Sequence, residues 1–302
     1  MSMRLEPIRH LFPFENRFHN HSGLRQHYVD EGFGAPVVML HGNPTWSFMY
    51  RTLIAGLRGA YRVIAPDHIG CGLSDKPDDT RYAYTLDRRV RDLSDLLESI
   101  GVTRDVTLVV HDWGGLIGLA WAVRHPERVE RLVILNTAAF PIPASTRLPL
   151  SIRLCRDTAL GAFCVRRFNL FSVAASHLAP RHRLRAEIRR AYTAPYDSWA
   201  NRIATLRFVQ DIPLGPADRS FAVVRETAEG LESLRSRPMM ICWGERDFVF
   251  DRHFLDEWMQ RFPSADVHRF PDAGHYVLED AGDRIVPLVR SFLVAHSVGT
   301  RV

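Results

Sequence analysis

The chain has 302 residues, of which 46% are hydrophobic and 24% are charged, a balance typical of an ordinary soluble globular protein. The formal net charge is +5, and Lys76 is the only lysine, so arginine supplies 38 of the 39 basic residues. These arginines are not interleaved with aromatic residues in any recognisable module, which argues against a role in binding nucleic acid.

Membrane-spanning and secreted classes are also not expected. No segment approaches the ~18 consecutive apolar residues of a membrane-spanning helix, and residues 1–7 lack the apolar core of a signal peptide. The cysteines show neither metal-ligand spacing nor a disulfide framework; they are Cys71, Cys155, Cys164 and Cys242. Together these features predict a protein of the reducing cytoplasm.

The first half of the chain predicts strands that alternate with helices. An antiparallel hairpin is expected at a sheet edge, over 14–20 and 24–30. Buried strands follow at 36–42, 61–67, 106–110 and 131–137, with helices at 47–57, 85–100 and from Gly115 to His125. Such alternation predicts an α/β protein with a doubly wound, mostly parallel sheet.

The alternation stops between Pro141 and about Ile212, where no strand-like run occurs. Apolar residues recur there at helical spacing, as in Leu148, Ile152 and Cys155, which predicts an inserted helical cap. Alternation then resumes with helices at 220–234, 254–261 and 285–296 and strands at 238–243 and 266–270. We therefore expect a core built from 1–140 and 213–302, interrupted by a cap over 141–212.

The strongest local signal lies at Val106–Gly115. Five apolar or β-branched residues, Val106 to Val110, predict a strand buried on both faces, and small apolar residues after Gly115 predict a closely packed helix. Asp112 falls at the sharp turn between them. This pattern is typical of a nucleophile elbow, with Asp where a hydrolase usually carries Ser. The purely structural alternative for Asp112 is an N-cap.

Further reactive side chains follow other strands of the predicted sheet. Asn43, Asp247 and His275 each lie just past a predicted strand, as Asp112 and Trp113 do. Groups at the carboxyl ends of parallel strands gather in one crevice, so we expect these five residues to meet. The chain order of nucleophile, acid and histidine is the order of α/β-hydrolases.

The sequence resembles the α/β-hydrolase superfamily over essentially its whole length. The motifs at 41–46 (His-Gly-Asn-Pro-Thr-Trp) and 110–115 (Val-His-Asp-Trp-Gly-Gly) resemble the haloalkane dehalogenase group. More narrowly, 135–140, 243–250 and the segments 194–199 and 208–213 resemble the OleB-type β-lactone decarboxylases of bacterial long-chain olefin biosynthesis. The resemblance implies decarboxylation of a cis-3-alkyl-4-alkyloxetan-2-one. In that family the acid follows either of two strands, and because Asn136-Thr137 offers no carboxylate, Asp247 is the better candidate.

The residue types imply a division of labour. Asp112, as nucleophile, would attack a carbon and form an ester, and His275, oriented by Asp247, would activate water. The backbone N–H groups of Trp113 and Asn43 could form an oxyanion hole. The Asn43 amide and the Trp113 indole are donors toward a halide or the oxygens of a lactone. This chemistry requires neither a metal ion nor an organic cofactor.

Several alternatives stay open at this stage. Purely structural roles are a turn residue for Asp247, a surface-loop histidine for His275, a pocket wall for Trp113 and an Asx-turn for Asn43. Asp67 is a rival acid, Tyr192 and Tyr196 could polarise an epoxide, and His41 and His111 are expected to support loops. Haloalkane dehalogenase is the runner-up function, followed by epoxide hydrolase and by a non-catalytic ligand receptor.

The cap also predicts a surface. An apolar stripe shares residues 148–175 with arginines at 153, 156, 166 and 167. Either the apolar side covers the active site and the arginines face water, or the surface also docks on an acidic partner enzyme or a membrane. The family resemblance implies a small hydrophobic substrate and a complex with the upstream condensing and lactone-forming enzymes.

Overall fold

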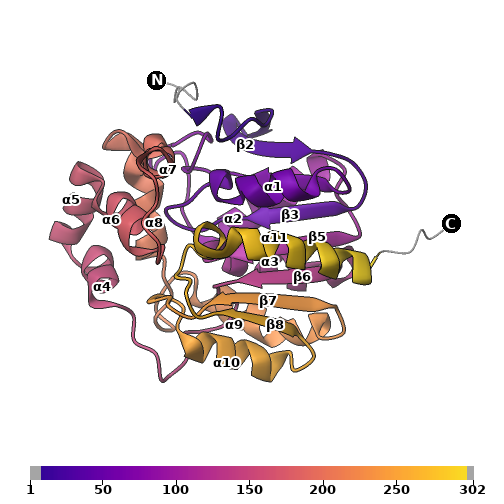
Figure 1. Ribbon diagram of the computed structural model, residues 1–302. Helices are drawn as coiled ribbons and strands as arrows, with labels where there is room; N and C mark the ends of the chain where they lie inside the picture. Colours follow the sequence, from indigo (N-terminus) through magenta and orange to yellow (C-terminus); the bar gives the residue numbers. More distant parts are fainter. Residues whose placement is uncertain (1–7, 298–302) are drawn as a thin grey trace.

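The structure, a computed structural model, describes residues 8–297 and is built around an eight-stranded sheet (Figure 1). The strand order is β1-β2-β4-β3-β5-β6-β7-β8. The strands are β1 (Arg17–His21), β2 (Leu24–Glu31), β3 (Pro36–Leu40), β4 (Arg62–Pro66), β5 (Val106–His111), β6 (Val129–Leu135), β7 (Met239–Gly244) and β8 (Asp266–Phe270). The β1–β2 and β2–β4 pairs are antiparallel and all the others are parallel, which confirms the predicted edge hairpin and mostly parallel sheet.

Helices cover both faces of the sheet (Figure 1). On one face lie α1 (Arg51–Leu57) and α11 (Val277–Ala295), and on the other α2 (Leu86–Ser99), α3 (Trp113–Arg124), α9 (Phe221–Gly230) and α10 (Arg252–Arg261). Successive β5 side chains serve the two faces in turn: Leu108 and Val110 pack toward α3, and Val109 packs toward α11. The unbroken apolar run in β5 follows from this burial on both faces.

Five helices between β6 and α9 form the cap, and the described part of 141–212 contains no strand. The helices are α4 (Leu150–Asp157), α5 (Ala159–Phe168), α6 (Leu170–Leu178), α7 (Ala186–Thr193) and α8 (Ile203–Gln210). Helices α4, α5, α6 and α8 share a small apolar core of their own, which includes Ile152, Val165 and Leu206, whereas α7 packs into the core on the α1 and α11 face of the sheet. The cap lies at the end of the sheet where the parallel strands finish (Figure 1).

The last helix begins earlier than the sequence predicted. The apolar spacing placed it at 285–296, whereas α11 begins at Val277 and ends at Ala295. Ala281 adopts φ −137° and ψ 19°, a kink that interrupts the helical periodicity of the first turns. Pro287 also lies inside the helix. The early turns therefore escape a search for regular apolar spacing, because the kink and the acidic pair Glu279 and Asp280 obscure it.

Two further observations concern the whole chain. Among the described residues, no helix combines the length and apolar character that crossing a bilayer would require. The single lysine, Lys76, lies in the loop after β4, where its ammonium group donates to the carbonyl oxygens of Gly72 (2.7 Å) and Ser74 (3.0 Å). Burial lowers the pKa of this lysine.

Candidate active site

The turn between β5 and α3 holds Asp112 in a conformation that few residues adopt. Its φ is 50° and its ψ is −127°. A Cβ atom at Gly114 would overlap the Leu40 carbonyl oxygen, and one at Gly115 would overlap the Thr137 side chain. The two glycines therefore allow α3 to start directly against the sheet. The Thr137 hydroxyl in turn donates to the Asp112 carbonyl oxygen.

The loops after β7 and β8 bring Asp247 and His275 to Asp112. The Nδ1 atom of His275 lies 2.8 Å from Asp247 Oδ2, and its Nε2 atom lies 3.5 Å from Asp112 Oδ2. All three side chains are nearly buried, Asp112 being 8% exposed. The structure thus places the predicted nucleophile, base and acid in one chain of contacts.

Two opposing effects set the charge state of His275. Burial would lower the pKa of the imidazole, but the charges of Asp247 and Asp112, and the hydrogen bonds to both, raise it to about 10. His275 is therefore an imidazolium at neutral pH, held between two carboxylates. His111 donates from Nε2 to the His275 carbonyl oxygen (2.8 Å), and burial lowers the pKa of His111 to about 4. A neutral His111 thus supports the loop of His275, the role expected for it.

Asn136, at the end of β6, is a positioning residue that the sequence did not reveal. Its amide donates to Asp247 Oδ2 (3.0 Å) and to the Gly244 carbonyl oxygen (3.0 Å), and its Oδ1 accepts from Gly244 N–H (2.8 Å). Asp247 also accepts from the backbone N–H groups of Val249 and Phe250. Asn136 occupies the position after β6 where some relatives of the family would carry the acid. Here its amide instead orients the acid that follows β7, Asp247.

The two predicted anion donors, Asn43 and Trp113, line the same cavity as the nucleophile. The backbone N–H of Asn43 donates to Asp112 Oδ2 (3.3 Å), and its side-chain amide donates to the Thr205 carbonyl oxygen in α8 (3.1 Å). An amide has two protons, so one remains for a ligand. The Trp113 indole N–H makes no hydrogen bond within residues 8–297, and Trp113 lines the cavity above Asp112.

A buried cation lies behind Trp113. The Arg89 guanidinium stacks 3.7 Å from the centre of the Phe208 ring, and that ring lies 5.2 Å from the Trp113 ring. Arg89 is 1% exposed, and its nitrogens find no hydrogen-bond acceptor within the described chain. With no hydrogen-bonded carboxylate among the described residues, Arg89 adds positive potential on the side of the site where an anion would be held.

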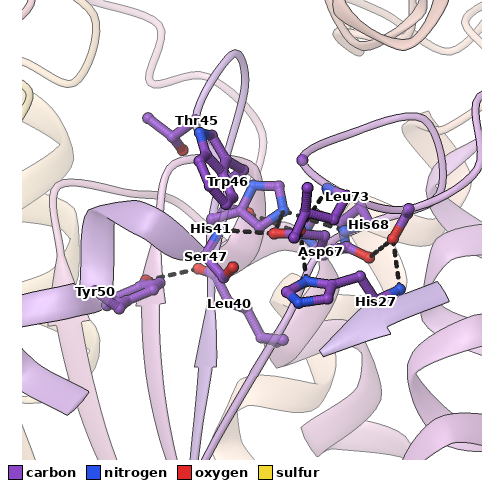
Figure 2. Close-up of polar contacts among 12 residues, drawn as sticks. His27, Leu40, His41, Thr45, Trp46, Ser47, Tyr50, Asp67, His68 and Leu73 are labelled. Carbon is purple, nitrogen blue, oxygen red and sulfur yellow. Dashed lines mark hydrogen bonds and ion pairs between the residues drawn. The ribbon is translucent and has the colours of Figure 1, made fainter. Parts of the chain in front are cut away.

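A second buried polar cluster supports the Asn43 loop, which continues β3 (Figure 2). Asp67 accepts from His27 Nδ1 (2.8 Å) and from the backbone N–H groups of Ser47 (2.7 Å) and Leu73 (2.8 Å). Burial would raise the pKa of Asp67, but His27, His41 and the backbone donors lower it to about 2. His41 Nε2 accepts from the backbone N–H of His68 (3.1 Å). Asp67 is therefore committed to this cluster and does not serve His275.

The cap encloses a cavity of about 440 Å³ above the nucleophile. Asn43, Asp112, Trp113 and His275 form its polar floor. The rest of the lining is almost wholly apolar and comes mainly from α4, α5 and α6, with Val209 and Phe248 from other segments. Such a cavity suits an apolar molecule that presents one reactive polar group to the floor.

The tyrosines considered for epoxide chemistry point elsewhere. Tyr192 OH donates to Glu279 Oε1 (2.5 Å), and Tyr196 OH donates to the Thr45 carbonyl oxygen (3.2 Å). Neither residue lines the cavity. The structure therefore offers no tyrosine hydroxyl to polarise an epoxide above Asp112.

Within residues 8–297, one side-chain group has the composition of a cation site: His21, Asp92 and Asp95. Asp92, however, accepts from Tyr82 OH (2.6 Å) and pairs with Arg88 (2.8 Å). Its charge is thus already matched by a guanidinium. The group involves β1 and α2 and includes none of the residues that line the cavity, so it offers nothing to the site.

Comparison with known proteins adds to this geometry. A family model described as the alpha/beta hydrolase fold matches residues 35–282. The chain is 53% identical over 284 residues to a cis-3-alkyl-4-alkyloxetan-2-one decarboxylase of Shewanella oneidensis, covering 94% of this chain and 89% of the relative. It is 51% identical over 278 residues to a protein of the same name from Xanthomonas campestris, covering 90% and 93%.

Haloalkane dehalogenases are similar at a greater distance. Haloalkane dehalogenase 2 of Mycobacterium tuberculosis is 32% identical over 290 residues, covering 96% of this chain and 98% of the relative. The crystal structure of the haloalkane dehalogenase DatA from Agrobacterium tumefaciens superposes with a TM-score of 0.85 at 27% identity, covering 94% and 97%.

Proposed function

The chain belongs to the α/β-hydrolase fold family, and we propose that it is a β-lactone decarboxylase, which converts a cis-3,4-dialkyl β-lactone to a long-chain cis-alkene and CO2. The observation that carries the proposal is the carboxylate of Asp112, which lies 3.5 Å from His275 Nε2 on the floor of an apolar cavity. The relatives that share about half of their residues with this chain carry the corresponding name.

The first step opens the four-membered ring. An Asp112 carboxylate oxygen attacks the ring carbon that bears the alkyl group and the ring oxygen. The carbon–oxygen bond of the ring breaks, an ester to Asp112 forms, and the ring oxygen leaves as part of a carboxylate on the neighbouring carbon. The Trp113 indole N–H and the free proton of the Asn43 amide are placed to hold that new anion, with Arg89 behind them.

The second step releases both products. The bond between the new carboxylate and its carbon breaks, and its electron pair forms the alkene. The ester bond breaks at the same time, CO2 leaves, and Asp112 regains its carboxylate. Atoms and charge balance without water. Inversion in the first step followed by anti elimination in the second gives a cis-alkene from a cis-lactone.

His275 serves this sequence as a fixed positive charge. Its imidazolium, shared between Asp247 and Asp112, stabilises the carboxylate of Asp112 when elimination regenerates it. The ester of Asp112 carries no charge, so its formation removes one of the two carboxylates that raise the pKa of His275. A hydrolytic enzyme would use that drop to turn His275 into a base for water.

Haloalkane dehalogenation is the second candidate, because it uses the same residues. A halide expelled by Asp112 would lie where the lactone carboxylate lies, against the indole N–H of Trp113. That N–H is free of protein partners within the described residues, and solved dehalogenases share the fold. The two reactions differ in the fate of the ester, which eliminates CO2 in one and meets water in the other.

The deciding experiment offers both substrates to one preparation. We expect a cis-3,4-dialkyl β-lactone to yield the cis-alkene, detected by gas chromatography, with one equivalent of CO2. A bromoalkane of similar length should release bromide far more slowly. Rapid bromide release without alkene formation from the lactone would assign the dehalogenase function instead.

We also propose that the protein acts in the cytoplasm. Cys71, Cys155 and Cys242 are buried as free thiols, and Cys164 is half-buried and also unpaired. Unpaired thiols at all four positions suit a reducing compartment. Fractionation of the native host into cytoplasmic, membrane and periplasmic extracts would test this location.

A further inference from the structure

The first three helices of the cap present large apolar side chains to solvent. Fourteen large hydrophobic side chains are exposed within residues 8–297, and eight of them lie between Leu150 and Leu178. Leu160 is 73% exposed, Leu150 is 71%, Leu178 is 66% and Phe168 is 61%. A patch of this density on a single chain marks a surface that contacts an apolar partner.

The patch surrounds the mouth of the active-site cavity. Leu154, Leu160, Leu170 and Leu178 line the cavity and are also exposed at its rim. An apolar molecule that leaves the cavity therefore passes between exposed leucines. In water, both the departing molecule and the leucines at the mouth would expose apolar surface to solvent, which is unfavourable.

Positive charge surrounds the same patch. Eight arginines and one aspartate occur between 147 and 185, a net charge of +7 that exceeds the +5 of the whole chain. Arg153, Arg167 and Arg183 form no ion pair with any carboxylate in the described part of the chain, whereas Arg156 pairs with Asp218 (2.6 Å) and Arg166 donates to the Trp199 carbonyl oxygen. Unpaired guanidinium groups beside exposed leucines match anionic headgroups above acyl chains.

We propose that the surface formed by α4, α5 and α6, hereafter the cap rim, docks on an anionic lipid bilayer and exchanges apolar substrate and product with it. A rigid protein partner on the cap rim would seal the mouth, whereas a fluid apolar phase covers the leucines and still admits the substrate. The inference rests on the proposed function for the identity of the molecule exchanged. The docking itself stands on exposure and charge alone.

The test is sedimentation of the full chain with vesicles, without substrate. Wild-type protein should sediment with vesicles of phosphatidylcholine and phosphatidylglycerol and remain in the supernatant with phosphatidylcholine alone. Arg153→Glu plus Arg167→Glu should lower the partition coefficient at least about tenfold, because each basic side chain near an anionic surface contributes. Phe163→Glu plus Phe168→Glu should have a similar effect, since both rings are exposed outside the cavity.

Matched controls come from the opposite end of the sheet. Phe33, 78% exposed between β2 and β3, and Arg104, in the loop before β5, offer the same residue types away from the cap. Phe33→Glu and Arg104→Glu should sediment like wild type. Arg153 and Arg167 are exposed, so we expect their substitution to leave the fold intact, and circular dichroism of every variant checks this.

The outcomes separate the proposals. Wild-type protein that stays off anionic vesicles, or cap-rim variants that bind as tightly as wild type, would overturn the docking. A second outcome is that wild type does not bind vesicles but forms a dimer in sedimentation equilibrium, and that Phe163→Glu plus Phe168→Glu abolishes the dimer. This result would assign the cap rim to contact with a second copy of the chain. Co-purification with an upstream enzyme under the same condition would assign it to that partner. Vesicle binding without lactone turnover would refute the proposed function and leave the docking standing.

Discussion

Asp112 combines an unusual backbone conformation with a reactive side chain. A non-glycine residue with φ near 50° and ψ near −127° costs about 1–3 kcal/mol, which the surrounding contacts must offset. The hydrogen bonds from Thr137 to the Asp112 carbonyl and from Asn43 N–H to its carboxylate provide such contacts. The strain aims the carboxylate into the cavity and away from the capping position of α3, where no side-chain cap occurs.

Asp112→Asn tests the nucleophile. The amide has nearly the same shape and keeps the elbow, but it is a poor nucleophile, so turnover of the lactone should fall by at least roughly 10⁴-fold. Circular dichroism and the thermal midpoint should change little. Asp112→Ala, which cannot revert by deamidation, is the control. Undiminished turnover in both variants would remove Asp112 from the mechanism.

The charge of His275 predicts a dependence of stability on pH. Its pKa rises from 6.5 to about 10 on folding, so the folded state holds a proton that the unfolded chain releases. This contribution is complete below pH 6.5, declines as pH rises, and is lost above about pH 10. Urea unfolding at pH 6, 8 and 10 should show wild type losing roughly a few kcal/mol more than His275→Asn across that range. Parallel curves for the two proteins would show that His275 is not held as an imidazolium.

Among the structural elements, the loop after β3 depends on a cluster that includes no residue of the cavity floor. Asp67 is fully buried and connects β2, the start of η2 (Ser47–Tyr50) and the loop after β4 that contains Leu73. Both oxygens of the Asp67 carboxylate accept hydrogen bonds. An asparagine at this position would therefore direct its NH2 group at one of the N–H donors that now bind the carboxylate. The loop after β3 is thus held in place by the hydrogen bonds of Asp67, which follows the neighbouring strand β4 (Figure 2).

Asp67→Asn should therefore cost stability as well as activity. Removing one partner of a buried ion pair typically costs about 3–5 kcal/mol, and we expect a loss near the lower value in chemical denaturation. The wild-type advantage should shrink in acid, since the lowered pKa of Asp67 stabilises the fold above pH 3.8 and this contribution is lost as pH falls through about 2. Asp95→Asn, at an exposed carboxylate, is the matched control and should behave like wild type. Equal stability of the two variants would contradict the assigned role.

Much of the sheet was predictable because the parallel strands β3 to β7 are largely apolar runs that end in polar loops, whereas β8 has only Val267 and Phe270 as apolar residues. Asp112, Asp247 and His275 could be found because each lies within five residues of the end of a parallel strand: Asp112 directly after β5, Asp247 three residues after β7 and His275 five residues after β8. Asn136 could not, since its contact with Asp247 joins residues 111 positions apart and an amide carries no signature of that role. The hydrogen bond from the Asn43 amide to the Thr205 carbonyl oxygen could not be predicted either, because it depends on how the cap packs on the core.

At the scale of the whole molecule, one buried ion pair joins the two sections of the core to the cap. Arg51 in α1 makes two hydrogen bonds to Glu279 in α11, at 2.5 and 2.8 Å, and Tyr192 in α7 donates to the same carboxylate. Burial would lower the pKa of Arg51, but the contacts with Glu279 and Tyr192 raise it. Three segments that are distant in sequence therefore converge on one carboxylate.

Glu279→Gln should loosen this junction. We expect unfolding free energy to fall by about 3 kcal/mol, because the Arg51 charge is left buried and poorly paired. Tyr192→Phe should cost about 1 kcal/mol, the value of one hydrogen bond. The double variant should lose less than the sum, since both changes act on the same carboxylate. Glu232→Gln, from a solvent-exposed pair with Arg235, is the control and should change stability little.

The setting of Lys76 has a practical consequence for chemical labelling. It is the chain's only ε-amine, and its protons are directed at two backbone carbonyl oxygens. Acylating reagents that decorate most proteins at many lysines would find no second side-chain amine here, and at neutral pH this one remains engaged. Succinimidyl dyes should therefore leave the arginines and every side chain of the active site unmodified. Acylation of Lys76 would therefore report opening of this loop, because the amine must leave both carbonyl oxygens before it can react.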